Sequence, residues 1–138
     1  MALTRMLSNA GHEMTVWSTL PAELEELNST RRQKNLPNME IPSSIVFTTA
    51  ATRFAMERIS YFCCSSVFVR TTARKASSFV QKGQIIVDAA KGIEPETLMT
   101  MCDVIASEIP QAKVVALSGA TNAEEVARDL PTTIVAAH

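Results

Sequence analysis

The feature that most constrains this fold is the alternation of short β-type runs with amphipathic helical segments along the whole chain. We expect strands at residues 13–17, 44–48, 61–64, 84–88, 113–117 and 132–136. We expect helices at residues 3–10, 22–32, 69–80 and 123–129, a short one within 52–60, and one opened by Pro95. Parallel neighbours need a crossover connection, which is usually a helix. The pattern therefore predicts an α/β fold in which a largely parallel, doubly wound sheet is covered by helices on both faces.

Two of these assignments place cysteines in the core. Residues 61–64 are four large apolar or thiol residues bounded by serine, which is typical of a strand buried on both faces. The helix opened by Pro95 would carry four apolar or thiol side chains on one face, at Leu98, Met101, Cys102 and Ile105. Between the second helix and the second strand, the asparagines and prolines within 35–42 indicate a connecting loop.

Composition excludes several classes of protein. With 138 residues, 46% hydrophobic and 20% charged, the chain has the length and balance of one ordinary globular domain. Its formal net charge of -1 gives no reason to expect a nucleic acid as partner. The longest apolar stretches, such as 113–117 and 132–137, are far shorter than the ~20 residues of a membrane-spanning helix. We expect no membrane span and no signal peptide.

The cysteines and histidines indicate a reducing compartment and no metal. Cys63, Cys64 and Cys102 are an odd number, and a bond between adjacent cysteines strains the backbone. Reduced thiols in a cytoplasmic protein are the better interpretation. Neither His12 nor His138 is spaced from a cysteine as in a zinc site, so we expect no metal centre.

Ligands of doubly wound sheets bind outside the carboxyl ends of the strands. Small or polar segments follow three predicted strands here, at 65–66, 89–92 and 118–123. Lys91 is the only cation among them. Its ammonium could neutralise a phosphate or polarise a carbonyl, and the alternative is a solvated loop lysine.

The residues after the fifth strand also have two interpretations each. Gly119 permits a close backbone approach to a ligand, or it is an ordinary turn glycine. Thr121 could donate its hydroxyl to a substrate, or cap the helix that begins near Ala123. Ser65 and Ser66 lack the Gly-x-Ser-x-Gly pattern, which argues against a serine hydrolase.

Longer runs of the sequence resemble a known family. These runs are NAGHEMTVWS at 9–18, SVFVR at 66–70, KGIEPETL at 91–98, LSGATNAEEVA at 117–127 and LPT at 130–132. In their order and spacing they closely resemble the cofactor-binding half of bacterial NAD(P)-dependent glycerol-3-phosphate dehydrogenase. The resemblance implies a Rossmann-type fold and NAD or NADP as cofactor. It also implies hydride transfer between the cofactor and carbon 2 of sn-glycerol 3-phosphate, which gives dihydroxyacetone phosphate and serves phospholipid biosynthesis.

The resemblance also implies roles for individual residues. Lys91 would lie beside the substrate and the nicotinamide ribose, with Gly119 and Thr121 at the substrate. Ala123 would contact the cofactor and Phe68 would lie near the dinucleotide, while Trp17, Ser18 and Thr19 would lie by the adenine ribose. Thr19 stands where many members have Arg or His, so the cation that favours a 2′-phosphate is lacking, which favours NAD.

The chain departs from the family's pattern at both ends. Met1 aligns directly after the family's first strand and its Gly-x-Gly-x-x-Gly turn, so residues 1–138 are expected to form an incomplete Rossmann domain without that strand. The family continues beyond His138 into a helical domain with the general-base lysine, so no catalytic base is expected within the 138 residues. The alternative hypothesis is an inactive remnant that acts as a binding or dimerisation module, because exposed sheet edges attract another strand. A homodimer is compatible with either.

Overall fold

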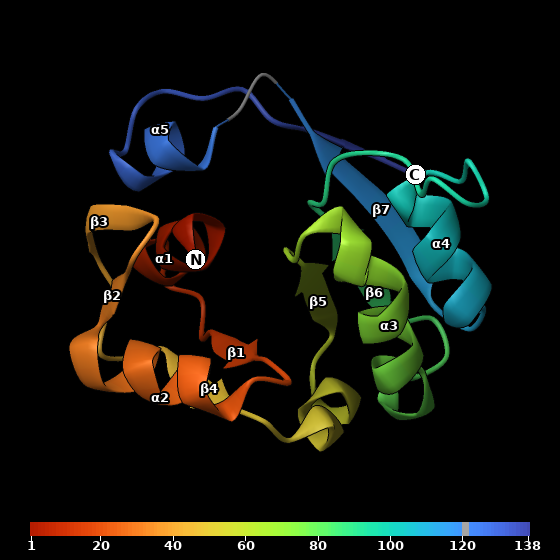
Figure 1. Ribbon diagram of the computed structural model, residues 1–138, viewed down its shortest axis with the longest axis horizontal. Helices are drawn as coiled ribbons and strands as arrows, with labels where there is room; N and C mark the ends of the chain where they lie inside the picture. Colours follow the sequence, from red (N-terminus) through yellow and green to blue (C-terminus); the bar gives the residue numbers. More distant parts are fainter. Residues whose placement is uncertain (120–121) are drawn as a thin grey trace. The chain divides into compact units, whose positions relative to one another are not determined.

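The computed structural model describes residues 1–119 and 122–138, which form two compact units (Figure 1). The first unit comprises Met1–Ala50 and the described part of 120–133. The second comprises Ala51–Gly119 and Ile134–His138. Each unit has its own hydrophobic cluster of buried side chains, and each is described by itself below.

A four-stranded, mostly parallel sheet forms the centre of the second unit (Figure 1). Its strands, in spatial order, are β5 (Ile59–Phe62), β6 (Ile85–Asp88), β7 (Lys113–Ser118) and β8 (Val135–Ala137). The first three are parallel, whereas β8 pairs antiparallel with β7. The α/β prediction is confirmed, and the last predicted strand runs opposite to the others.

Two helices, α3 (Ser66–Ala76) and α4 (Met101–Glu108), pack against this sheet. Short 3-10 helices, η1 (Ala51–Met56) and η2 (Ser77–Phe79), precede β5 and follow α3. Ile86 of β6, Val69 of α3 and Ile105 of α4 are fully buried in one cluster. Because both helices meet the same side of β6, they cover one face of this sheet rather than one face each.

The start of α4 differs from the sequence prediction. The helix begins at Met101 instead of Pro95, because Thr100 and Asp103 form a capping box that ends the preceding loop. Leu98, predicted on the buried face, is exposed and has a φ of 58°. Cys102 is half-buried at the first turn of α4 rather than in the core.

The capping box makes a stability prediction. The Oγ1 of Thr100 accepts a hydrogen bond from the Asp103 amide at 3.2 Å. Replacing Thr100 with alanine removes this acceptor and should lower the free energy of unfolding by about 1 kcal/mol. Urea unfolding measures the change. Thr100→Ser keeps the hydroxyl and should retain most of the stability, and equal losses in the two variants would contradict the capping role.

The predicted strand at 61–64 is also displaced. The structure ends β5 at Phe62, which leaves Cys63 exposed and Cys64 half-buried beyond the strand. The chain turns into α3 here, with Ser65 as its N-cap residue, so the two thiols belong to the turn. All three cysteines are free thiols, as the sequence predicts.

The first unit contains two small sheets and three helices among its described residues (Figure 1). Its elements are α1 (Ala2–Asn9), β1 (Thr15–Trp17), α2 (Pro21–Thr30), β2 (Arg32–Gln33), β3 (Leu36–Glu40), β4 (Val46–Thr48) and α5 (Ala123–Ala127). Strands β1 and β4 pair in parallel, and β2 and β3 form an antiparallel pair. Pro21 occupies the first turn of α2, as predicted.

The β2–β3 pair replaces the loop predicted within 35–42. Proline and asparagine indicate a loop, yet Pro37 lies inside β3. Tertiary packing explains the difference: Leu36 and Met39 of β3, and Ile41 after it, are buried in the cluster of the first unit. Burial of these apolar side chains outweighs the local turn propensity.

Strands β1 and β5 are edge strands in the part of the chain that is described, as are β2, β3, β4 and β8. Strand β1 pairs only with β4, and β5 pairs only with β6. Each therefore lies at the edge of its sheet. No helix among the described residues has the length and apolar character needed to cross a membrane.

Candidate functional site at the carboxyl ends of the strands

In the second unit, two of the predicted site residues meet at neighbouring strand ends. Lys91 follows β6, and Gly119 follows β7 directly. The Lys91 Nζ donates a hydrogen bond to the Gly119 carbonyl oxygen at 3.3 Å. Because β6 and β7 are parallel neighbours, their carboxyl ends coincide, which brings Lys91 and Gly119 together.

A shallow hollow of about 300 Å³ opens at the same strand ends. It is lined by the end of β6 and the loop after it, by the end of β7 and by the start of α4: Asp88, Ala90, Lys91, Gly92, Thr100, Met101, Cys102, Ala116, Leu117 and Ser118. The ammonium of Lys91 is thus placed at a concave surface, where it can donate hydrogen bonds to an anionic or carbonyl oxygen.

Asp88 is a residue of this hollow that the sequence interpretation missed. It is only 4% exposed, and its Oδ1 accepts a hydrogen bond from the Ala90 amide at 2.9 Å. The Cys102 thiol donates to Oδ2 at 3.4 Å. Burial raises the pKa of Asp88 above its ordinary value, and burial together with this carboxyl raises the pKa of Cys102 to about 11. The sequence feature that could have identified Asp88 is its place as an aspartate at the end of an otherwise apolar strand.

Gly92 lets the loop after β6 pass close to the start of α3. Its φ is 118°, a conformation that residues with a side chain rarely adopt. A Cβ placed there would lie 3.6 Å from the Cβ of Ser66. Phe68, predicted near the cofactor, lies in the first turn of α3 with its side chain exposed. The role of Phe68 near the cofactor stays a prediction.

An ion-pair network ties the same loop to the helices. Arg70 of α3 pairs with Glu94 of the loop, Nη2 to Oε2 at 2.5 Å, and with Glu108 of α4, Nη1 to Oε1 at 2.7 Å. Arg74 also pairs with Glu108, at 2.9 Å. Sequence reasoning missed this network because its members are 24 to 38 positions apart.

The network predicts a loss of stability in acid. Hydrogen bonds from Arg70 lower the pKa of Glu94 from 4.5 to about 2, and hydrogen bonds from Arg74 and Arg70 lower that of Glu108 equally. The stabilisation is complete above pH 4.5 and is lost as the pH falls toward 2, where both carboxylates protonate. Urea unfolding at several acidic pH values measures it. Glu94→Gln should flatten this dependence, and an unchanged slope would contradict the pairing.

In the first unit, the predicted adenine-ribose residues lie at the end of β1 and directly after it. The Trp17 Nε1 donates to the Thr49 carbonyl oxygen at 3.0 Å. The Ser18 hydroxyl donates to Glu23 Oε2 at 3.3 Å and accepts from the Leu20 amide at 3.2 Å. Thr19, between Ser18 and Leu20, is exposed. Trp17 ends β1, and Ser18 and Thr19 lie in the connection from β1 into α2.

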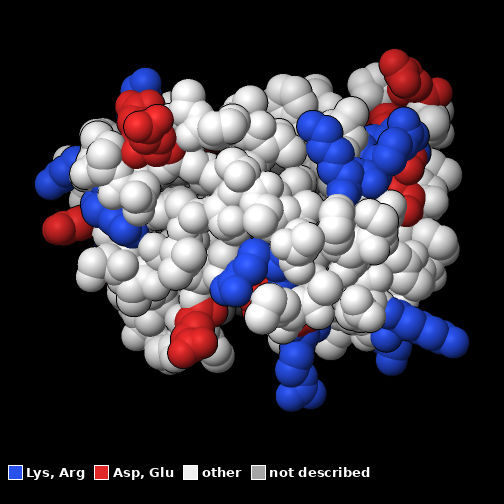
Figure 2. All heavy atoms as spheres, turned by 90° about the horizontal axis from the view of Figure 1, so that it is seen from below, with Lys and Arg blue, Asp and Glu red and all other residues white. Residues whose placement is uncertain are grey.

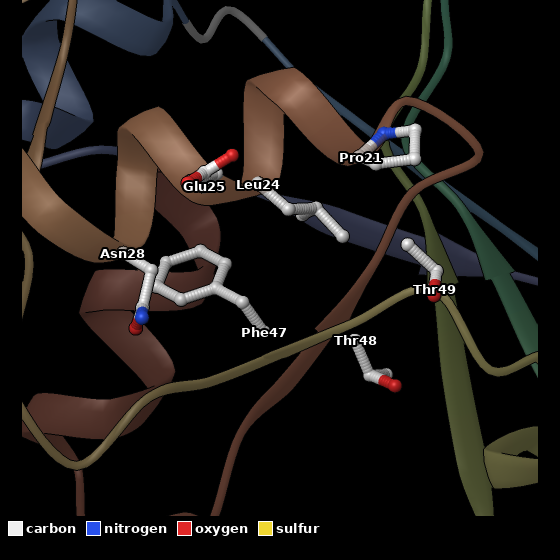
Figure 3. A pocket seen from close by; sticks show the side chains of 7 residues that line it. All are labelled: Pro21, Leu24, Glu25, Asn28, Phe47, Thr48 and Thr49. Carbon is white, nitrogen blue, oxygen red and sulfur yellow. The ribbon is translucent and has the colours of Figure 1, made fainter.

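A second hollow, of about 420 Å³, lies nearby in this unit. Figure 3 shows its lining, which comes from α2 and from the end of β4: Pro21, Leu24, Glu25, Asn28, Phe47, Thr48 and Thr49. The Phe47 ring is also covered by the Arg31 guanidinium, 5.1 Å from the ring centroid. The sequence interpretation identified none of these residues as part of a site, because they come from segments about twenty positions apart.

The last predicted residues lie around α5. Ala123 is the first residue of that helix and is exposed. The capping role that the sequence allowed for Thr121 is performed by Asn122, whose Oδ1 accepts from the Glu124 amide at 3.0 Å. Thr121 itself lies outside the described residues.

The charge on one face of the molecule is mixed, and the described residues hold no group of metal ligands. On the face shown in Figure 2, basic and acidic side chains both occur, in several places next to one another. Within 1–119 and 122–138, no three His, Cys, Asp or Glu side chains are grouped as metal ligands.

Comparisons with known proteins identify relatives over nearly the whole chain. A relative from Lactobacillus delbrueckii subsp. bulgaricus, glycerol-3-phosphate dehydrogenase [NAD(P)+] 2, is 56% identical over 99% of this chain and 43% of its own length. Another, from Agathobacter rectalis, is 46% identical over 98% of this chain and 41% of its own. This chain thus spans about two fifths of each relative.

Solved structures show the same fold. The crystal structure of glycerol-3-phosphate dehydrogenase from Coxiella burnetii matches 96% of this chain and 41% of its own, with a TM-score of 0.85 and 21% identity. That likeness shows a Rossmann-type fold. The family model described as NAD-dependent glycerol-3-phosphate dehydrogenase N-terminus matches residues 1–138. The chain belongs to this family of glycerol-3-phosphate dehydrogenase N-termini.

Proposed function

We propose that residues 1–138 are the NAD- or NADP-binding Rossmann part of a glycerol-3-phosphate dehydrogenase. The enzyme would interconvert sn-glycerol 3-phosphate and dihydroxyacetone phosphate, a step toward phospholipids. The observation that carries the proposal is the pairing of Lys91 and Gly119 at neighbouring strand ends, where a Rossmann-type sheet binds its ligands. The general-base lysine and the helical domain of the family's pattern would lie outside these residues.

The donor set fits a dinucleotide and a phosphorylated three-carbon substrate. Lys91 offers an ammonium beside a hollow, and Phe68 offers an exposed ring at the start of α3. The positive φ of Gly92 keeps the intervening loop close to α3. Gly119, Thr121 and Ala123 would complete the substrate and cofactor contacts of the family.

Lys91 would act on charge that develops during the reaction. The bound cofactor supplies or accepts the hydride at carbon 2 of the substrate. When dihydroxyacetone phosphate is reduced, its carbonyl oxygen gains negative charge, and the ammonium of Lys91 would stabilise that charge or hold the neighbouring phosphate. Lys91 would thus bind and orient the substrate, while the proton donor lies elsewhere.

The residues after β1 would bind the adenosine side of the cofactor. Trp17, Ser18 and Thr19 lie at the carboxyl end of that strand, and Ser18 presents a hydroxyl held by Glu23. Thr19 offers no positive charge for a 2′-phosphate, which favours NAD over NADP. The free thiols favour the cytoplasm as the site of action.

A second candidate function is an inactive module that binds a partner or dimerises. The specific observation in its favour is that β1 and β5 each have a strand on one side only among the described residues. Such edges can accept a further strand. Sedimentation of the 138-residue chain would detect a homodimer, and a dimer that binds no nucleotide would favour this candidate.

The test of the first candidate is a chimera. In it, this chain replaces the matching segment of the Lactobacillus delbrueckii relative, and every other residue of that relative is kept. We expect the chimera to consume NADH when dihydroxyacetone phosphate is added, which the loss of NADH absorbance measures. The relative itself is the control. A chimera that is folded by circular dichroism but inactive, beside an active control, would overturn the proposal.

A further inference from the structure

The loop that carries Lys91 is anchored on both sides of that residue. We call residues 89–100, between β6 and α4, the Lys91 loop. Before Lys91, the Asp88 carboxylate accepts a hydrogen bond from the Ala90 amide at 2.9 Å. After Lys91, Glu94 is held by Arg70 of α3. Lys91 itself is exposed, so its position depends on the backbone between these two anchors.

Glu94 forms the second anchor, and both of its carboxylate oxygens accept hydrogen bonds. Arg70 donates to both of its carboxylate oxygens, Nε to Oε1 at 2.7 Å and Nη2 to Oε2 at 2.5 Å. The Thr97 hydroxyl also donates to Oε2, at 2.5 Å. The Glu94 side chain is only 15% exposed. A bidentate arginine–carboxylate pair fixes orientation as well as distance, because two parallel bonds must form together.

The backbone of the loop closes around the same residue. The Glu94 amide donates to the Met99 carbonyl at 2.9 Å, and the Glu94 carbonyl accepts from the Leu98 amide at 2.8 Å. The Met99 sulfur also accepts a hydrogen bond from the Arg70 guanidinium at 3.8 Å. Arg70 therefore fixes a closed turn of backbone three positions beyond Lys91, rather than a single side chain.

We infer that Glu94, held by Arg70, is a positioning residue for Lys91, which sets where the Lys91 ammonium lies against the Gly119 carbonyl. This inference rests on the proposed function. Lysine has a long flexible side chain, so its head group can reach one fixed place only if its backbone is fixed. A displacement of about 1 Å at a reacting group can cost about 100-fold in rate. Breaking the Arg70–Glu94 pair should therefore slow turnover through Lys91.

Glu108 provides a matched control. It is an acid of the same type, 14% exposed, and it pairs with the same Arg70 at 2.7 Å. It lies on α4 instead of the Lys91 loop. Glu94→Gln and Glu108→Gln each remove one negative charge that pairs with Arg70. Glu108→Gln also removes the partner of Arg74, whereas only Glu94→Gln removes the anchor of the Lys91 loop.

The test is a set of variants in the chimera. We expect Glu94→Gln to lower kcat by about tenfold or more and Glu108→Gln to leave it unchanged. In a Lys91→Ala background, Glu94→Gln should have no further effect, because the residue it positions is gone. Equal kcat values for the two glutamine variants would overturn the inference. An undiminished effect of Glu94→Gln without Lys91 would overturn it as well.

A second readout separates this inference from the proposed function. In the 138-residue chain, lysines are methylated with a carbon-13 label, and the Lys91 resonance is assigned with Lys91→Arg. We expect Glu94→Gln to shift that resonance and Glu108→Gln to leave it in place. If Lys91→Ala does not affect turnover, the proposed function of Lys91 fails, whereas the resonances still decide whether Glu94 positions it. An unshifted resonance in Glu94→Gln overturns the inference.

Discussion

Replacing Lys91 with alanine in the chimera is expected to lower kcat for dihydroxyacetone phosphate reduction by about 100-fold or more. The reason is the place of its ammonium, at a hollow formed by the ends of β6 and β7 and 3.3 Å from the Gly119 carbonyl oxygen. A positive charge there stabilises the transition state, in which negative charge develops on the substrate oxygen. Steady-state kinetics of NADH consumption measure the loss.

Lys82 supplies the control for this prediction. It is an exposed lysine in the turn before β6, at the opposite end of the strand from Lys91. Lys82→Ala removes the same charge from the same unit and should leave kcat unchanged. If Lys91→Ala and Lys82→Ala behave alike, Lys91 is an ordinary solvated lysine and the site assignment fails.

Replacing Ile105 with alanine is expected to lower the free energy of unfolding by about 2–5 kcal/mol. Ile105 of α4 is 0% exposed and packs in the cluster that contains Val69 and Ile86. Its truncation leaves a cavity between the helices and the sheet, which the packed neighbours cannot fill. Urea unfolding, with circular dichroism as the signal, measures the change.

Ile93→Ala is the matched control, because it makes the same chemical change at a side chain that is 60% exposed. It should change the free energy of unfolding by no more than about 0.5 kcal/mol. Equal losses for the two variants would mean that α4 does not pack on the sheet as described.

The sequence predicted correctly those elements in which the hydrophobic pattern and the flanking turn residues indicate the same boundaries. Strand β6 is a run of apolar residues bounded by turn residues, and it forms within one residue of the prediction. The predicted start of α4 was wrong, because proline marks a possible first turn, whereas the capping box at Thr100 supplies actual hydrogen bonds. The β2–β3 pair was missed because its stability comes from tertiary burial of Leu36 and Met39.

The candidate site was predicted in part, for a related reason. Lys91 and Gly119 could be expected to meet, because both follow strands of one parallel sheet. Asp88 and Glu94 were not recognised, since their partners, Cys102 and Arg70, become neighbours only when α3 and α4 pack on the sheet. Such pairings across elements leave no local pattern in the sequence.

The measurement that tests the central claim most directly is a calorimetric titration of NADH into the folded chimera. This chain would supply the cofactor contacts of Lys91 and of Trp17 to Thr19, and cofactor binding does not depend on the catalytic base. We predict saturable binding of one NADH per chain, accompanied by a change in the fluorescence of Trp17, the single tryptophan of this chain. A folded chimera that binds no NADH, beside a parent enzyme that binds it, would contradict the account.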